Sequence, residues 1–219
     1  MKNNKKAVVL FSGGLDSTTV LYYALSKGYE CSCLLFNYGQ RHARELKSAV
    51  KIANNLKVPH FIVKLSLAWS NDALTNKNVK VPENKVAAKE IPVTYVPGRN
   101  TLFLSYGLSF AESAGASNIF IGANALDFSG YPDCRPQFID SYNKLIKSLG
   151  LTIKVQAPLV HMTKARIIKM GIGLKVPYQY TWSCYKGFSK PCGVCDSCKL
   201  RAKGFKEAGM RDPALESLK

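Results

Sequence analysis

Long hydrophobic runs are missing from this sequence. No stretch approaches the roughly 18 to 20 unbroken apolar residues that a membrane-spanning helix requires. The basic residues 1–6 are followed only by the short apolar run Ala7 to Phe11, which is too brief for the apolar region of a secretory signal. We therefore expect a cytoplasmic protein that makes no membrane contact.

Acidic residues are also scarce. The chain has 14 Asp and Glu against 31 Lys and Arg, which gives a net charge of +17. This excess suits a polyanionic ligand such as ATP or RNA. It is spread along the chain rather than gathered in a tail, so the charge by itself supports nucleic-acid binding only weakly. With 219 residues, 47% of them hydrophobic, the chain is long enough for one sizeable core and a small appended unit.

Strand-like and helix-like segments alternate along the sequence. The segments expected as strands are 7–11, 31–36, 61–65, 118–122 and 152–156, and those expected as helices are 17–26, 41–56, 101–114, 138–149 and 164–170. Residues 66–92 are irregular. This alternation predicts an α/β fold, a parallel sheet with helices on both faces. Ligands of such sheets bind at the carboxyl ends of the strands, where three loops fall: 12–17, 37–42 and 123–136.

The first of these loops, Ser12-Gly13-Gly14-Leu15-Asp16-Ser17, is the most informative motif. Adjacent glycines allow the backbone to approach a ligand closely, and the free N–H groups of the following helix favour a bound anion. No lysine follows at the spacing of a Walker loop. The motif predicts a phosphate cradle; the alternative is a simple Gly-Gly turn, with Asp16 or Ser17 capping the helix.

Seven cysteines in a cytosolic chain indicate metal binding or reactive thiols rather than disulfides. Four of them have the spacing C-x7-C-x2-C-x2-C, which predicts a closed, structural zinc site; their positions are Cys184, Cys192, Cys195 and Cys198. A redox function is disfavoured because a fourth thiol would be superfluous, whereas an iron–sulfur cluster stays open. Cys31 and Cys33 are expected in the core. For Cys134 a structural or substrate-lining role is favoured over catalysis.

Several motifs together carry a family resemblance. They are Phe11 to Ser17, Tyr38 to His42, Val96 to Asn100, Asp127 to Arg135, Thr181 to Cys184, the run Cys192 to Cys198, and Arg201. In this order they resemble the QueC family of 7-cyano-7-deazaguanine synthases, which belongs to the ATP pyrophosphatases, the PP-loop superfamily. The resemblance implies a Rossmann-like, adenine nucleotide alpha hydrolase-like domain over residues 1–180. It also implies a small helical zinc-binding unit over residues 181–219.

The resemblance further implies a ligase that forms C–N bonds in queuosine biosynthesis. Such an enzyme converts 7-carboxy-7-deazaguanine and ammonia into 7-cyano-7-deazaguanine through acyl-adenylate and amide intermediates. It uses two ATP and releases two AMP and two pyrophosphate. The resemblance also implies Mg²⁺ with the ATP, one zinc ion per subunit and a homodimer, with no requirement for nucleic acid.

The PP-loop resemblance assigns ATP binding to the first strand end and helix start: Leu10, Phe11, Ser12, Gly13, Gly14, Leu15, Asp16, Ser17, Thr18, Thr19 and Val20. Within this set Ser12, Asp16 and Ser17 are candidate catalytic residues. Asp16 is interpreted as a cap or a Mg²⁺ contact, with the cap favoured. Lys164 stands where related pyrophosphatases carry a phosphate-contacting lysine, and Arg99 and Arg41 are further candidates to stabilise the adenylate and departing AMP.

The loop near residue 130 is the candidate substrate site. Carboxylates accept well from the ring N–H and the amine of a deazaguanine, so Asp127 and Asp133 are the expected acceptors, with Tyr131 or Phe128 stacking on the ring. Arg135 is expected to grip the substrate carboxylate as a fork. The alternative is an ordinary tight turn. Either His42 or His161 could move a proton from ammonium, but the interpretation as a hydrogen-bonded structural histidine is favoured for each.

Two other functions remain as alternatives. A tRNA-thiolating PP-loop enzyme also adenylates a carbonyl oxygen, but the cysteine spacing and the loop at 127–135 disfavour it. A zinc-bearing nucleic-acid-binding regulator would suit the net charge and the four cysteines. It has no use for a pyrophosphate loop, and the sequence shows no recognition helix with base-reading residues.

Overall fold

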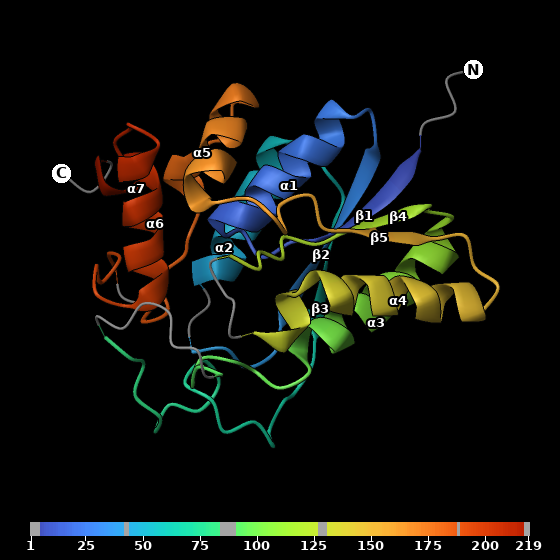
Figure 1. Cartoon of the computed structure of the whole chain (residues 1–219), viewed down its shortest axis with the longest axis horizontal. Coiled ribbons are helices and arrows are strands. Elements are labelled where there is room, and N and C mark those ends of the chain that lie inside the picture. The colour runs from blue at the N-terminus through green and yellow to red at the C-terminus, as the bar shows by residue number, and fades with distance from the viewer. Residues whose placement is uncertain (1–4, 42–43, 84–90, 127–130, 188, 217–219) are drawn as a thin grey trace.

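The computed structural model describes residues 5–41, 44–83, 91–126, 131–187 and 189–216. Five parallel strands form one sheet in the order β3-β2-β1-β4-β5 (Figure 1). The strands are β1 (Lys6–Leu10), β2 (Glu30–Asn37), β3 (His60–Lys64), β4 (Asn118–Phe120) and β5 (Lys154–Gln156). The predicted parallel α/β sheet is therefore confirmed, with strand ends that differ from the expected ones by no more than two residues.

Helices cover both faces of the sheet (Figure 1). One face carries α1 (Leu15–Ser26), α2 (Arg44–Asn55) and α5 (Lys164–Gly173), and the other carries α3 (Arg99–Ala114) and α4 (Pro136–Ser148). Alternate residues of β1 serve the two cores: Val9 packs with the first group of helices and Val8 with the second. Because both faces are buried, β1 is apolar from Ala7 to Leu10, as is usual for a central strand of a parallel sheet.

The strand order reverses between β1 and β4, at the centre of the sheet. From β1 the chain moves outward to β2 and β3, then crosses back to β4 and β5. The loop after β4 meets the start of α1 there, since a Cβ on Gly122 would lie 3.0 Å from the backbone nitrogen of Ser17. A crevice at the carboxyl ends of strands that diverge in this way is the ordinary ligand site of an open α/β sheet.

The irregular segment expected at 66–92 contains no helix or strand in its described residues, 66–83 and 91–92. Arg41 holds it in place. The Nη2 group of Arg41 donates to the carbonyls of Asn76 at 2.8 Å, Lys77 at 2.9 Å and Val79. Arg41, a candidate for contact with AMP, thus uses its Nη2 group to fix this loop, and it also belongs to the cavity lining.

The C-terminal part packs against α5. It contains α6 (Asp196–Glu207) and the short α7 (Pro213–Glu216), and α6 approaches so closely that a Cβ on Gly204 would lie 2.3 Å from Cγ of Lys164. Arg201 is buried and connects α6 to the segments that precede and follow it. Its guanidinium pairs with Asp212 at 2.7 and 2.9 Å and donates to the hydroxyl of Thr181 at 2.7 Å.

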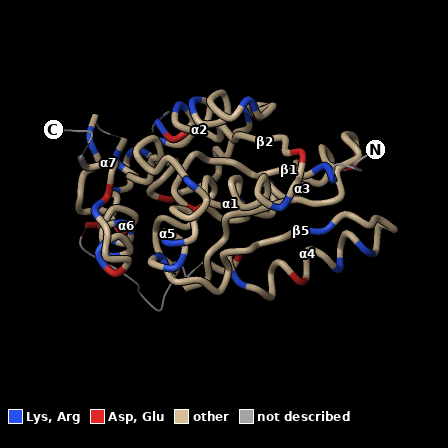
Figure 2. Tube along the Cα trace, turned by 90° about the horizontal axis from the view of Figure 1, so that it is seen from above, with Lys and Arg blue, Asp and Glu red and all other residues tan. Residues whose placement is uncertain are grey.

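Basic side chains are distributed over the surface rather than concentrated on one element. Figure 2 shows Lys and Arg on α2, α4, α5 and α6, with few acidic residues between them. In the described part of the chain, no helix is both long enough and apolar enough to cross a membrane.

Candidate active site

A cavity of about 250 Å³ lies at the crevice between the ends of β1, β2 and β4. The loop after β1 and the start of α1 form one wall, and Lys164 lies beside them. Tyr38, Glu45 and Arg99 form a second wall, contributed by the loop after β2, by α2 and by α3. The cavity therefore joins loops from distant parts of the sequence at the position that the strand order favours.

The Ser-Gly-Gly loop has the geometry of an anion cradle. Gly13 has φ +78°, and a Cβ there would lie 2.4 Å from the backbone nitrogen of Ala49, so glycine is required both for the turn and for the close packing on α2. The hydroxyls of Ser12 and Ser17 lie 3.0 Å apart, and the N–H of Gly14 donates to Oγ of Ser12 at 3.3 Å. The positive end of α1 meets the cavity directly behind these hydroxyls.

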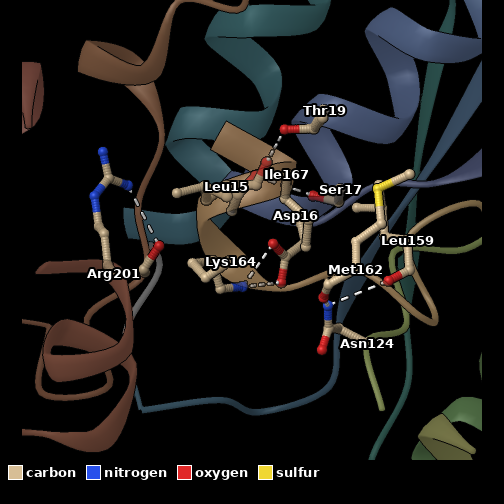
Figure 3. A network of polar contacts seen from close by, with 12 residues as sticks. Leu15, Asp16, Ser17, Thr19, Asn124, Leu159, Met162, Lys164, Ile167 and Arg201 are labelled. Atoms are coloured by element: carbon tan, nitrogen blue, oxygen red, sulfur yellow. Dashed lines mark hydrogen bonds and ion pairs between the residues drawn. The ribbon is translucent and has the colours of Figure 1, made fainter. Parts of the chain in front are cut away.

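Asp16 does not cap α1, so that interpretation is wrong. The helix begins at Leu15, its N-cap residue is Gly14, and no side chain accepts a capping hydrogen bond there. The carboxylate of Asp16 instead accepts from Nζ of Lys164, which lies 2.7 Å from each of its oxygens (Figure 3). Because Asp16 is already inside the helix, its side chain points across to α5 rather than back along its own turn.

Four residues of the predicted ATP set do not line the cavity: Gly13, Thr18, Thr19 and Val20. Gly13 packs on α2, and Val20 is fully buried in the core. The hydroxyl of Thr18 donates to the carbonyl of Gly14 at 2.7 Å, and that of Thr19 donates to the carbonyl of Leu15 at 2.8 Å. The remaining members of the set do line it: Leu10, Phe11, Ser12, Gly14, Leu15, Asp16 and Ser17.

The loop after β4 is fixed so that Lys164 faces the cradle. The side-chain amide of Asn124 donates to the carbonyls of Leu159 at 3.2 Å and Met162 at 2.7 Å (Figure 3). Thr163 then caps α5 by accepting from the N–H of Arg166. Lys164 is thus the first residue of a firmly positioned helix, and both Lys164 and Asp16 are largely shielded from solvent.

Arg99 lies on the opposite wall of the cavity at the start of α3. Its Nη1 donates to the hydroxyl of Tyr38 at 3.3 Å, and its guanidinium lies 5.9 Å from the centre of that ring. Burial acts to lower the pKa of Arg99, but the surrounding groups Tyr38, Tyr131 and Asp133 outweigh it and raise the pKa. Arg99 therefore carries its charge inside the cavity.

The predicted substrate loop is only partly assembled at the cavity. Asp127 and Phe128 lie outside the described residues, as does His42. Tyr131 is buried on the cavity wall, and its hydroxyl lies 2.7 Å from Oγ1 of Thr94. The ring is therefore in place, whereas its hydroxyl already has a partner.

The structure does not bring the other two described members of that loop to the cavity lining. Oδ2 of Asp133 accepts from the backbone N–H of Asn100 at 3.2 Å at the start of α3, and burial raises the pKa of this carboxyl. Arg135 is exposed at the N-cap of α4. The sequence placed both residues near the ligand because it could not show that Asp133 serves a neighbouring helix or that Arg135 turns outward.

The four predicted metal ligands come together. The sulfur atoms of Cys184, Cys192, Cys195 and Cys198 all lie within 4.8 Å of one another. The intervening turns use Gly187 at φ +66° and Gly193 at φ +71°, as the spacing requires. A tetrad of sulfur ligands is consistent with a zinc ion, and the N–H groups of Lys186 and Cys192 donate to the sulfur of Cys184 at 3.4 and 3.3 Å.

The other cysteines are protonated thiols. Cys31 and Cys33 are buried in the core as predicted, and burial raises the pKa of Cys31 to about 12. Cys134 lines the cavity, and burial together with the neighbouring Asp133 raises its pKa to about 12. A thiol with so high a pKa is a poor nucleophile, which supports a lining role. His161 is exposed, contrary to its interpretation as a structural histidine.

Several cavity residues had no role assigned at the sequence level, among them Glu45, Trp182 and Tyr185. The N–H of Trp182 donates to the carbonyl of Gly13 at 3.0 Å, which connects the cradle to the cysteine tetrad two residues further on. Its position beside Cys184 was an available signal. Glu45 carried none, because one more acidic residue on a polar helix is indistinguishable from a solvated side chain.

Residues 6–209 match the family model described as "Queuosine biosynthesis protein QueC". Two relatives are described as 7-cyano-7-deazaguanine synthase. The one from Thermoplasma volcanium is 50% identical over 216 residues, covering 95% of this chain and 90% of the relative. The one from Picrophilus torridus is 54% identical over 212 residues, covering 93% and 88%.

Two solved structures show the same fold at low identity. An NMN synthetase from Francisella tularensis aligns with a TM-score of 0.52 at 15% identity, covering 98% of this chain and 82% of that one. A 4-thiouridine synthetase bound to RNA and ATP aligns with a TM-score of 0.50 at 19% identity, covering 98% and 53%. At such identities the likeness concerns the fold alone.

Proposed function

We propose that the chain, which belongs to the family of the queuosine biosynthesis protein QueC, uses its cavity to turn a carboxylate into a nitrile at the expense of ATP. The activity of the relatives, 7-cyano-7-deazaguanine synthase, is the activity of this chain, an ATP-dependent ligase with an adenine nucleotide alpha hydrolase-like fold. The observation that carries this is identity near one half over almost the whole length, together with the cradle at the strand-order reversal.

The reaction consumes 7-carboxy-7-deazaguanine, ammonia and two ATP, and yields the nitrile, two AMP and two pyrophosphate. A carboxylate resists ammonia because its oxygen is a very poor leaving group. Transfer of AMP to that oxygen creates a good one, and ammonia then gives the amide. A second adenylation, on the amide oxygen, permits loss of AMP and of the N–H protons to leave C≡N. One site serves both rounds because AMP is attached each time to an oxygen on the same carbon.

The cradle is the proposed pyrophosphate site. Its backbone N–H groups and the hydroxyls of Ser12 and Ser17 stabilise the charge that develops when the α-phosphorus is attacked in line. Lys164, held by Asp16, adds a positive charge beside it. The carboxylate of Asp16 lies on the cavity wall and is the type of oxygen ligand that Mg²⁺ takes, so it is the proposed residue for the Mg²⁺ that accompanies ATP and offsets phosphate charge.

The opposite wall is the proposed deazapurine site. The rings of Tyr38, Phe103 and Tyr131 offer faces for a flat heterocycle. Arg99 provides the cationic fork for the carboxylate, a role first expected of the exposed Arg135. Asp127, with Asp133 as an indirect contributor through α3, stays the proposed acceptor for the exocyclic amine.

The remaining features complete the proposal. The cysteine tetrad is proposed to hold one structural zinc ion per subunit. Residues 1–180 are proposed as the catalytic domain, with 181–219 as a zinc unit packed on it. The chain is proposed to act in the cytoplasm as a homodimer that needs no nucleic acid.

Mass spectrometry of the product tests the function directly. The protein is mixed with ATP, Mg²⁺, ammonium and 7-carboxy-7-deazaguanine, and the nitrile is expected together with two AMP for each nitrile formed. AMP release that required tRNA instead of the free deazapurine would replace this proposal by tRNA thiolation. Binding of nucleic acid without any AMP release would favour the regulator.

A further inference from the structure

Glu45 lies on the cavity wall between the two halves of the site. It is the second residue of α2, and its carboxylate interacts with the side chain of Ser12 in the cradle. A Cβ on Gly14 would lie 3.9 Å from its Oε1. The positive charge of Arg99 attracts the Glu45 carboxylate from the other side. The charge of Glu45 in turn raises the pKa of the Tyr38 hydroxyl. Glu45 thus stands where phosphate binding and deazapurine binding meet.

The proposed function, on which this inference rests, requires that ammonium lose a proton inside the cavity. Ammonia is mostly ammonium at neutral pH, and ammonium has no lone pair with which to attack the adenylate. A base in the site must therefore remove a proton. Among the described residues that line the cavity there is no histidine, and the only carboxylates are Asp16 and Glu45. Both oxygens of Asp16 are engaged by Lys164.

The surroundings of Glu45 suit a base. Burial raises its pKa above the ordinary value of a glutamate, while the hydrogen bond with Ser12 and the charge of Arg99 act in the opposite direction. The groups that face it are Ser12 from the loop after β1, Tyr38 from the loop after β2 and Arg99 from α3. A carboxylate that binds protons more tightly than it would in water is a more effective proton acceptor near neutral pH.

We propose that Glu45 is a catalytic residue, the general base that deprotonates ammonium in the amide-forming step. One N–H bond of ammonium breaks, and its proton moves to the Glu45 carboxylate. The freed lone pair forms the C–N bond with the acyl carbon, and the C–O bond to AMP breaks with its electron pair leaving on the AMP phosphate. The nitrogen then gives its surplus proton to that departing phosphate, and Glu45 returns its own proton to water.

The test separates the two halves of the reaction in Glu45→Gln. Exchange of labelled pyrophosphate into ATP, with 7-carboxy-7-deazaguanine and no ammonium, reports adenylation alone. This exchange is expected to stay within about twofold of the native rate, whereas amide formation from ammonium falls about a hundredfold. Hydroxylamine, which is neutral at pH 7, needs no base, so its conversion to the hydroxamate is expected to be nearly native in the variant. Glu112→Gln, the same change at an exposed position on α3, is the matched control and leaves all three rates unchanged.

Three results would overturn the inference. Amide formation from ammonium at the native rate would show that no base acts at Glu45. An equal loss of exchange and amide formation would assign Glu45 to phosphate or Mg²⁺ binding. An equal loss with hydroxylamine would show a positioning effect. If Glu45→Gln does not fold by thermal melting, Glu45→Asp takes its place, with exchange kept and the ammonium rate reduced. Failure of the native protein to form the nitrile would refute the proposed function instead.

Discussion

Nζ of Lys164 lies 2.7 Å from both carboxylate oxygens of Asp16, although 148 positions separate the two residues in the sequence. The pair joins the start of α1 to the start of α5 directly beside the proposed phosphate cradle (Figure 3). It couples the stability of the fold to the geometry of the site, because neither helix start can move without breaking it.

Lys164→Met is expected to lower the free energy of unfolding by about 3 kcal/mol, because the change leaves a shielded carboxylate without its partner. The double variant Asp16→Asn/Lys164→Met is expected to recover part of that loss, since no unpaired charge remains. Urea unfolding measures both values. Lys169→Met, an exposed lysine on the same helix, is the control. A double variant no more stable than the single one would contradict the pairing.

Gly13→Ala is expected to cost about 3 kcal/mol and to abolish ATP binding. The added Cβ meets the backbone of α2 at 2.4 Å at a residue with φ +78°. Gly28→Ala is a matched control, because Gly28 has φ +79° but no atom within 4 Å of the added Cβ; it is expected to cost about 1 kcal/mol and to leave ATP binding intact. Calorimetric titration with ATP measures the affinity of both variants. Equal effects of the two changes would show that the close packing of Gly13 on α2 is not required.

Ser17→Ala is expected to abolish AMP release while leaving the fold intact. Its hydroxyl lies 3.0 Å from that of Ser12, within the proposed pyrophosphate cradle, so its loss removes a donor at the place where charge develops. Ser26→Ala, on the far end of the same helix and exposed, controls for loss of a helical hydroxyl. Discontinuous AMP measurements together with circular dichroism give both readouts. AMP release at the native rate would show that the Ser17 hydroxyl has no part in the reaction.

Removal of the proposed zinc ion is expected to lower the free energy of unfolding by more than about 3 kcal/mol, which corresponds to about 10 °C in melting temperature. Cys195→Ser should melt at this lower temperature and show no further change with a chelator. Cys31→Ala, a core thiol distant from the tetrad, should still respond to the chelator as the native protein does. A melting curve that chelation leaves unchanged would contradict a structural metal.

The pH dependence of stability tests the position of Asp133. Burial raises the pKa of this carboxyl in the folded state, so the folded protein binds its proton more tightly than the unfolded chain. Its contribution to stability therefore falls as pH rises from its ordinary value near 4 through the raised value, and is restored on acidification. Asp133→Asn is expected to flatten that slope when urea unfolding is followed upward from about pH 4. An unchanged slope would place the carboxyl in solvent.

The sequence by itself determined the parallel sheet, the glycine turn between β1 and α1, and the cysteine tetrad. Short apolar strands, glycine turns and C-x2-C steps are local patterns, and the backbone conformations that they favour depend on neighbouring residues. For this reason the strand ends and the grouping of the four sulfur atoms were predicted closely. Gly13 was expected at the ATP and packs on α2 instead.

Only the tertiary structure decided which side chains meet. Asp16 faces Lys164, Asp133 serves the start of α3, Arg135 turns to solvent, and Glu45 enters the cavity. Each of these outcomes depends on how helices distant in sequence pack around the sheet, and no local pattern encodes such packing. A charged residue acquires its chemical role from the partners and the burial that the fold gives it.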